Sequence, residues 1–324
     1  MANFLNSIST PAHYGWSVDR FVYPLALLAH TPMLAEWGKN MWRKEHYQFF
    51  PLLMAFVAWR LVEAWREGGR GEVERREGEE KRERAGEEKG GRGDAGFAER
   101  KATKGEQNAT VATGLLMGNL LLLGASALAF SPFLIIPALM LLIASAFVAH
   151  QGWEGFRRVM PTWLLLLFIV PLPLNWDAQL VQNMQFLASQ LASAILDAFG
   201  QIHFREGVVL ATHTNNFLAE EACSGIRSLF SSLTVIAMYG VLHQYSPRRQ
   251  LFNLAQTVLW VIAGNAIRIA VIILVADHWT MAIASGPAHE VFGLVIFLLI
   301  LALALSTDRL LDLQPEKESL EWSS

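Results

Sequence analysis

The sequence predicts an all-α fold: a polytopic integral membrane protein with about eight transmembrane helices and a disordered, charged cytoplasmic loop. Three observations lead to this prediction. Of the 324 residues, 53% are hydrophobic, and the mean hydropathy is +0.30. Charge is concentrated, because 24 of the 55 acidic and basic side chains lie between Arg66 and Asn108. The rest of the chain contains apolar segments close to the roughly 20 residues needed to cross the hydrocarbon core of a bilayer.

Eight apolar segments qualify as predicted spans, near residues 22–38, 49–65, 110–130, 132–149, 160–175, 222–243, 251–275 and 290–308. The first two are the least apolar. The first carries His30, Pro32 and Glu36, and the second is interrupted by Arg60 and Glu63, so either segment could lie in the membrane interface instead. The N-terminus lacks a basic stretch followed by an apolar core, so the first spans are expected to serve as the targeting signal.

The charged insertion, residues 66–108, contains ten glycines and almost no large apolar residues. Such a segment cannot bury enough surface to fold, which predicts disorder in the cytoplasm, with at most a transient helix from Glu–Arg pairs over 72–84. Its acids and bases match at 12 each, which argues against a nucleic-acid partner. The predicted organisation is a membrane hairpin (1–65), this insertion, a membrane core (109–311) and a cytoplasmic tail (312–324).

The distribution of basic residues predicts the orientation in the membrane. Short loops flanking the later spans carry Arg157, Arg158, Arg248, Arg249 and Arg309, whereas 276–289 contains no Lys or Arg. By the positive-inside rule the basic loops are cytoplasmic, which places 176–221 and 276–289 outside. Within the former, 177–200 is amphipathic and is expected to lie in the outer interface. The loop after the first span (Lys39, Arg43, Lys44) disagrees, so the topology of the first hairpin stays open.

Cys223 is the only cysteine, so it cannot form an internal disulfide. It lies in EEACSGIRSL (220–229), in the first turn of the predicted span 222–243. Unpaired N–H groups and the positive end of the helix dipole stabilise a thiolate at such a position, and Arg227 lies one turn further on the same face. These features favour a reactive thiol. The alternative is a small buried hydrophobic side chain.

Arg268 and Asn265 lie three residues apart, and hence on one face, of the predicted span 251–275. A guanidinium at that depth requires a partner or a wet cavity, unless it extends to the headgroups. His289 follows Pro287 in the first turn of the last span; alone it would be interpreted as a solvated side chain. Together with Cys223, however, these groups bring a thiol, a cation and a titratable base toward one membrane face, as nucleophilic acyl transfer requires. No metal-binding or cofactor-binding motif is present, and no metal or cofactor is predicted.

Three motifs resemble the exosortase branch of the exosortase/archaeosortase superfamily: EACSGIRSL at the start of a span, NAIRI in the next, and a histidine opening the last. The upstream PLPLNW (171–176) and the extended segment 206–225 fit the same pattern in the same order. The resemblance covers roughly 160–308 well, is weak over the first hundred residues and does not account for the charged insertion.

The resemblance implies a membrane-embedded cysteine protease or transpeptidase in the bacterial inner membrane, with its active site toward the periplasm. Its partners would be membrane lipids and secreted proteins that end in a Pro-Glu-Pro motif, a transmembrane helix and a basic tail, in bacteria that make extracellular polysaccharide. It also implies roles for residues: nucleophile for Cys223, acid/base for His289, electrostatic stabiliser for Arg268, and support for Arg227, Asn265, Glu221 and Ser224.

The competing hypothesis is a non-catalytic membrane component, such as a transporter or an assembly factor of a polysaccharide-export system. Transporter sites lie near the bilayer midplane, between broken helices and inverted repeats. The polar residues of this sequence instead cluster toward one face, and no repeat is visible.

Overall fold

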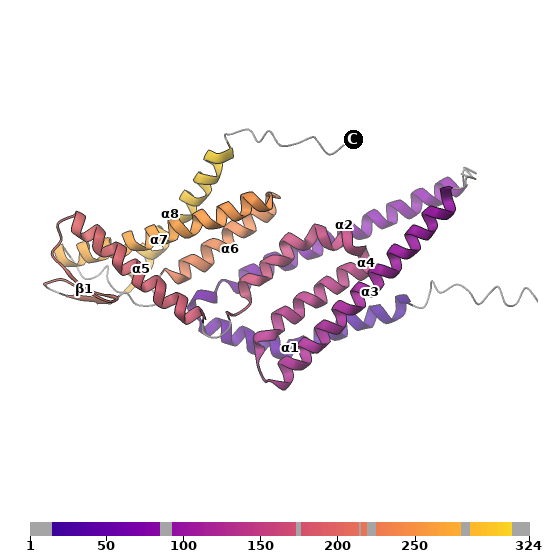
Figure 1. Ribbon diagram of the computed structural model, residues 1–324, viewed down its shortest axis with the longest axis horizontal. Coiled ribbons are helices and arrows are strands. Elements are labelled where there is room, and N and C mark those ends of the chain that lie inside the picture. Colours follow the sequence, from indigo (N-terminus) through magenta and orange to yellow (C-terminus); the bar gives the residue numbers. More distant parts are fainter. Residues whose placement is uncertain are drawn as a thin grey trace, which may run out of the picture. The chain divides into compact units, whose positions relative to one another are not determined.

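A computed structural model describes residues 15–84, 93–172, 176–213, 215–218, 225–279 and 286–312, which are mostly helical (Figure 1). Its elements are, in order, α1 (Gly15–Arg43), η1 (Glu45–Tyr47), α2 (Phe50–Arg84), α3 (Gly93–Leu128), η2 (Pro132–Leu134), α4 (Ile135–Leu164), η3 (Leu165–Ile169), α5 (Trp176–Ala198), β1 (Phe204–Glu206), β2 (Val209–Ala211), β3 (Asn216–Leu218), α6 (Ile226–Leu242), α7 (Pro247–His278) and α8 (Gly286–Asp312). The prediction of a purely α-helical fold therefore omitted a small sheet.

Four of the described helical segments are long and apolar enough to cross a membrane: Thr103–Leu128, Pro132–Ile169, Pro247–His278 and Gly286–Leu310. The predicted count of eight spans is not confirmed. Part of the difference is length, because the apolar helix α6 has only 17 residues. Another part is that one long segment contains two predicted spans.

That long segment reverses direction at Gly152, whose φ of 70° and ψ of 179° interrupt α4. Trp163 Nε1 donates to the carbonyl of Met140 at 2.8 Å, so the two arms on either side of Gly152 lie against each other (Figure 1). One buried apolar cluster joins both arms: Ala144, Phe147, Val148, Phe156 and Val159. Glycine adopts this positive φ without steric cost. The predicted spans 132–149 and 160–175 thus correspond to the two arms of a helical hairpin.

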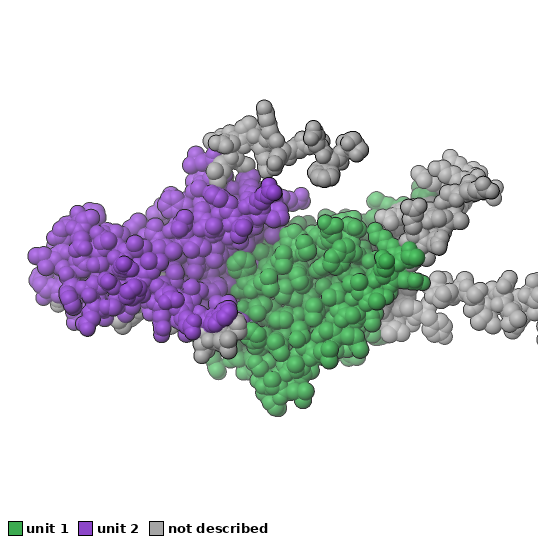
Figure 2. Space-filling view, in the orientation of Figure 1, with its two compact units in different colours: residues 1–43, 54–170 green, residues 44–53, 171–324 purple. Residues whose placement is uncertain are grey.

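The chain forms two compact units (Figure 2). The first comprises residues 1–43 and 54–170, and the second comprises residues 44–53 and 171–324. This division differs from the predicted one, because the short stretch 44–53 packs with the C-terminal half of the chain. Residues 313–324 of the predicted tail lie outside the described part.

The charged insertion is helical where the structure describes it, not disordered as expected, since α2 continues to Arg84 and α3 begins at Gly93. The physical reason is helix cooperativity: a helix that extends an existing one needs no new nucleus, and each added residue needs only to propagate it. Each pair of oppositely charged side chains four residues apart adds about 0.2–0.5 kcal/mol to the stability of the helix. The low apolar content therefore did not prevent helix formation here.

In the second unit, α5 packs lengthwise against α7 instead of lying across it. Val181, early in α5, shares a core cluster with Val261, whereas Leu196, late in α5, clusters with Ile273. Small buried residues on α5, among them Ala192, allow this close approach. Since α7 is a candidate membrane span, the expectation that 177–200 lies flat in the interface does not fit this packing.

The sheet has strand order β1-β2-β3 with both pairs antiparallel. Its central residue Leu210 is 1% exposed and joins the core between α5 and α7. Asp277, near the end of α7, accepts hydrogen bonds from Gln201 Nε2 at 2.7 Å and from Thr212 Oγ1 at 2.9 Å. These bonds attach the sheet region to the end of α7.

Candidate active site

Three predicted site residues, Cys223, Glu221 and Ser224, lie outside the described residues. The description resumes at Gly225, the N-cap of α6. The geometry of the site therefore comes from the four other predicted residues: Arg227 on α6, Asn265 and Arg268 on α7, and His289 on α8.

Arg268 and His289 are in contact, as the prediction of a shared site requires. The Arg268 guanidinium lies 2.7 Å from Nε2 of His289, and Arg268 is 9% exposed. A guanidinium can only donate, so Nε2 accepts and this geometry places the imidazole proton on Nδ1. The Arg268 charge is thus directed at a titratable group.

Gly293 explains how Arg268 reaches α8. It lies one turn after His289, and a Cβ at this position would be 3.0 Å from the Arg268 Nη2 atom. The absence of a side chain lets the guanidinium lie close to the helix. Any larger residue would have to displace it from His289.

Asn265 contacts the start of α6 in a similar way. Gly225 has a φ of 76°, and a Cβ there would lie 2.9 Å from the amide carbon of Asn265. Asn265 is 3% exposed. Both the positive φ and the close approach require glycine at position 225. Asn265 therefore packs against the chain two residues after Cys223, and its predicted supporting role stays a prediction.

A cavity of about 280 Å³ joins Arg227, Arg268 and His289, whereas Asn265 does not line it. It is lined by Arg227, Ser228, Ser231, Arg268, His289, Glu290, Gly293, Leu294 and Phe297. One end is thus polar and charged, and the apolar part is formed by α8. Three polar side chains not singled out from the sequence line it: Ser228, Ser231 and Glu290. The helical spacing from Arg227 could have indicated Ser231, since residues four apart share a face.

This constellation agrees with an independent comparison of families. Residues 40–306, most of the chain, match the family model of the transmembrane exosortases. The chain belongs to this family. No curated protein and no solved structure matches it. The exosortase match begins before η1 and ends within α8, so it includes every described residue of the candidate site.

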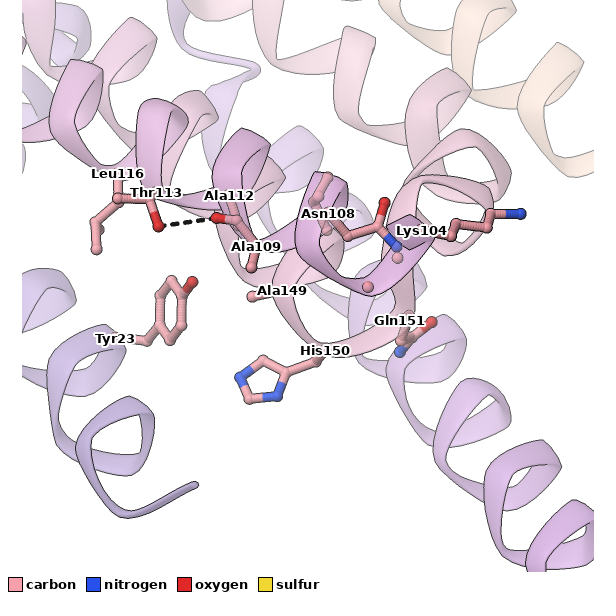
Figure 3. Close-up of a pocket in the computed structure, with 13 residues that line it drawn as sticks. Tyr23, Lys104, Asn108, Ala109, Ala112, Thr113, Leu116, Ala149, His150 and Gln151 are labelled. Atoms are coloured by element: carbon pink, nitrogen blue, oxygen red, sulfur yellow. Dashed lines mark hydrogen bonds between the residues drawn. The ribbon is translucent and has the colours of Figure 1, made fainter. Parts of the chain in front are cut away.

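A second cavity, of about 570 Å³, lies in the first unit of this exosortase-family chain, between α1, α3 and α4 (Figure 3). Tyr23, His150 and Lys104 are among its polar lining residues, and Lys104 and His150 are exposed. None of the predicted site residues contributes to it. Although this cavity is larger, the smaller one is the one lined by Arg268 and His289.

Metal ligation has no support in the described part of the chain, where no group of three or more His, Cys, Asp or Glu side chains could hold a metal ion. The chemistry that the described side chains offer is that of a guanidinium, an imidazole and hydroxyl groups.

Proposed function

We propose that this chain is a membrane-embedded cysteine protease and transpeptidase that cleaves, and then transfers, secreted proteins bearing a Pro-Glu-Pro carboxy-terminal sorting signal. The observation that carries the proposal is the contact of Arg268 with His289 on a cavity that α6 also lines, because α6 begins three residues after Cys223. Membership in the exosortase family supports the reaction class.

In the proposed reaction, Nε2 of His289 takes the thiol proton of Cys223, and the thiolate attacks the carbonyl carbon of the scissile peptide bond. Arg268 now donates to that same Nε2. It must therefore release the imidazole and turn toward the sulfur or the developing oxyanion. A preorganised cation in a low-dielectric site stabilises such charge strongly.

The carbon–nitrogen bond then breaks, and the departing amine takes the proton from His289. The acyl group stays on Cys223 as a thioester. Attack by water on this thioester gives hydrolysis, and attack by an acceptor amine gives transpeptidation. In both cases His289 accepts the proton of the incoming group, and the thiol is regenerated.

The proposed location is the bacterial inner membrane, with the active site toward the periplasm. The stretch 276–289, which includes the end of α7 and the first turn of α8, contains no Lys or Arg, as expected of an outer segment. Secreted substrates reach that side, and a link to extracellular polysaccharide systems is part of the proposal.

The test is co-expression with a tagged substrate that carries the sorting signal. Cys223→Ala is expected to abolish processing and accumulate unprocessed substrate, because the thioester requires sulfur. Its membrane level should stay normal, since replacing a thiol with a methyl group near the interface loses little packing. Normal processing by a well-expressed Cys223→Ala chain would exclude the cysteine mechanism.

A paired test uses two histidines of the same unit. His289→Gln is expected to lose processing, whereas His278→Gln should keep it, because His278 is exposed at the end of α7 and does not line the cavity. Equal rates in the two variants would remove His289 from the reaction.

A further inference from the structure

The loop between the first two helices belongs to the unit that holds the candidate site. Within it, Lys44 forms an ion pair with Asp177 of α5, and Tyr47 is fully buried. The Tyr47 hydroxyl accepts a hydrogen bond from the backbone N–H of Leu172 at 3.3 Å. Burial alone would raise the pKa of Asp177, but the Lys44 ammonium outweighs it and lowers that pKa below its usual value. Several independent contacts therefore fix this loop.

The same loop covers one face of α6. The ring of Phe230 lies 5.7 Å from that of His46, 5.3 Å from that of Tyr47 and 6.5 Å from that of Phe49, measured between centroids. Aromatic pairs at such separations are favourable beyond the area they bury. Phe230 follows Arg227 by three residues, so both side chains share one face of the helix. The loop is thus fixed directly beside Arg227.

Glu45 completes this arrangement, because its carboxylate accepts a hydrogen bond from Nη2 of Arg227 in an ion pair. The two side chains are 51% and 44% exposed. Arg227 lines the cavity and Glu45 does not. The two arginines of the cavity therefore differ in their partners: a carboxylate neutralises Arg227, whereas Arg268 contacts an imidazole that accepts without a formal charge.

We infer that Glu45 is a positioning residue for the candidate site. It holds Arg227 at the polar end of the cavity and compensates its charge. The inference rests on the proposed function. It assigns a role in the site to a residue 182 positions away from Arg227 in the sequence.

An ion pair this exposed adds little to stability, in part because ordering two long side chains costs entropy. Here the backbone of Glu45 is already fixed by its buried neighbours His46 and Tyr47. Its carboxylate can therefore orient Arg227 at a low additional entropic cost. The expected consequence of losing it is a displaced guanidinium rather than an unfolded chain.

The first measurement tests the contact and does not depend on activity. Thermal stability of the purified full-length chain is compared for Glu45→Gln, Arg227→Gln and the double variant. If the two side chains interact, the effects of the single substitutions will not add. Additive effects would show that the pair does not form and would overturn the inference.

The second measurement is the cleavage rate of a peptide carrying the sorting signal. Glu45→Gln is expected to lower kcat about tenfold, because a small misplacement of a positioned group slows the reaction more than it weakens binding. Glu36→Gln is the matched control: it removes a carboxylate of similar exposure from an ion pair with Lys39, neither of which lines the cavity, and should keep kcat within about twofold. Equal kcat for Glu45→Gln and the wild type would overturn the role.

A charge exchange separates positioning from mere attachment of the loop. The double variant Glu45→Arg with Arg227→Glu restores an ion pair with reversed charges. If the ion pair only attaches the loop, this double variant will recover cleavage, which would contradict the inference. If the cation at the cavity is needed, the cleavage rate will stay low. If the wild-type chain cleaves no peptide, the proposed function is excluded. The role of Glu45 is then excluded with it, even if the two side chains are coupled in stability.

Discussion

Both units bury polar side chains in apolar helices, but these side chains serve different purposes in the two units. In the first unit, His30 is fully buried, and its Nδ1 donates to the carbonyl of Ala26 at 2.7 Å. Its Nε2 accepts from Asn119 at 2.9 Å, and Asn119 also donates to the carbonyl of Ala138 at 2.7 Å. The network ends on backbone oxygens of α1 and α4. In the second unit the corresponding polar groups line a cavity.

The difference shows how to interpret a polar residue in a membrane helix. A histidine bonded between an amide and a carbonyl has both ring nitrogens engaged, so it joins helices and has no lone pair to offer a substrate. The imidazole of His289 instead contacts a side chain that can move away, beside a cavity of about 280 Å³. The two histidines differ in burial, since His30 is fully buried and His289 is half-buried, and they differ in the partners of their ring nitrogens.

The strongest test of this comparison is at Arg268. Arg268→Ala is expected to lower the cleavage rate about 10²–10³-fold, as removal of one oxyanion contact does. Arg268→Lys should recover only part of the loss, because an ammonium on a flexible stem does not reproduce the planar donor geometry. Initial rates at matched membrane levels provide the measurement.

The control for Arg268 is Arg205→Ala, which removes a half-buried arginine of the same unit that does not line the cavity and whose guanidinium donates to the Gly207 carbonyl. Its rate should match the wild type. If Arg268→Ala cleaves at the wild-type rate, Arg268 is a structural residue. The polar groups of the two units would then not differ in the way described above.

A smaller effect is expected in the first unit, at Asn119. Asn119→Leu leaves Nε2 of His30 buried without its donor, which should destabilise the chain by about 1–3 kcal/mol. The thermal midpoint should fall, while the cleavage rate per folded molecule stays unchanged. Thermal unfolding in detergent and rate measurements on the surviving protein separate the two quantities.

The double variant Asn119→Leu with His30→Leu sharpens this test. Because both polar partners are replaced by apolar groups, most of the stability should return. A double variant that stays as unstable as the single one would show that the network does more than satisfy its own members. No such recovery of activity is expected when Arg268 and His289 are both replaced.

Local sequence patterns placed Arg268 and His289 in one membrane layer from their positions in two spans, and the two side chains are in contact. The roles predicted for them stay predictions. Glu45 could not be found this way, because its partner is far away in the chain and nothing in its neighbourhood is unusual. The contact depends on the packing of the loop 44–53.

The architecture deviated where tertiary context overruled local composition. The stretch 177–200 has the amphipathic pattern of an interfacial helix, but its small residues pack against α7. The reversal at Gly152 was anticipated only as a gap between two spans, since one glycine gives no strong signal of a turn. The cavity-lining Ser228 and Ser231 were missed because serine is common in membrane helices for reasons of packing.

The smallest effect is expected in the charged insertion. Residues 104–108 must be kept, because Lys104 lines the larger cavity and Asn108 Oδ1 accepts from the backbone N–H of Trp153 at 3.4 Å. Gly68 must also be kept, since it lies against Gln151. Between these limits, Gly71 and Gly78 have open space around them. The part of the insertion that can be removed is therefore narrower than the predicted boundaries.

Replacing residues 70–100 with a short Gly/Ser linker should change the cleavage rate by less than about twofold, because the entropy of closing a loop depends only weakly on its length. The thermal midpoint should also stay close to that of the wild type, since the deleted helical turns extend past the packed part of the unit. A second replacement by an alanine-rich helical segment of the original length serves as the control. If both replacements lose activity at normal membrane levels, the charges of the insertion bind something that the reaction needs, and the first unit has a functional role after all. If only the linker loses activity, the helical extensions of α2 and α3 matter as rigid elements, and the charges do not.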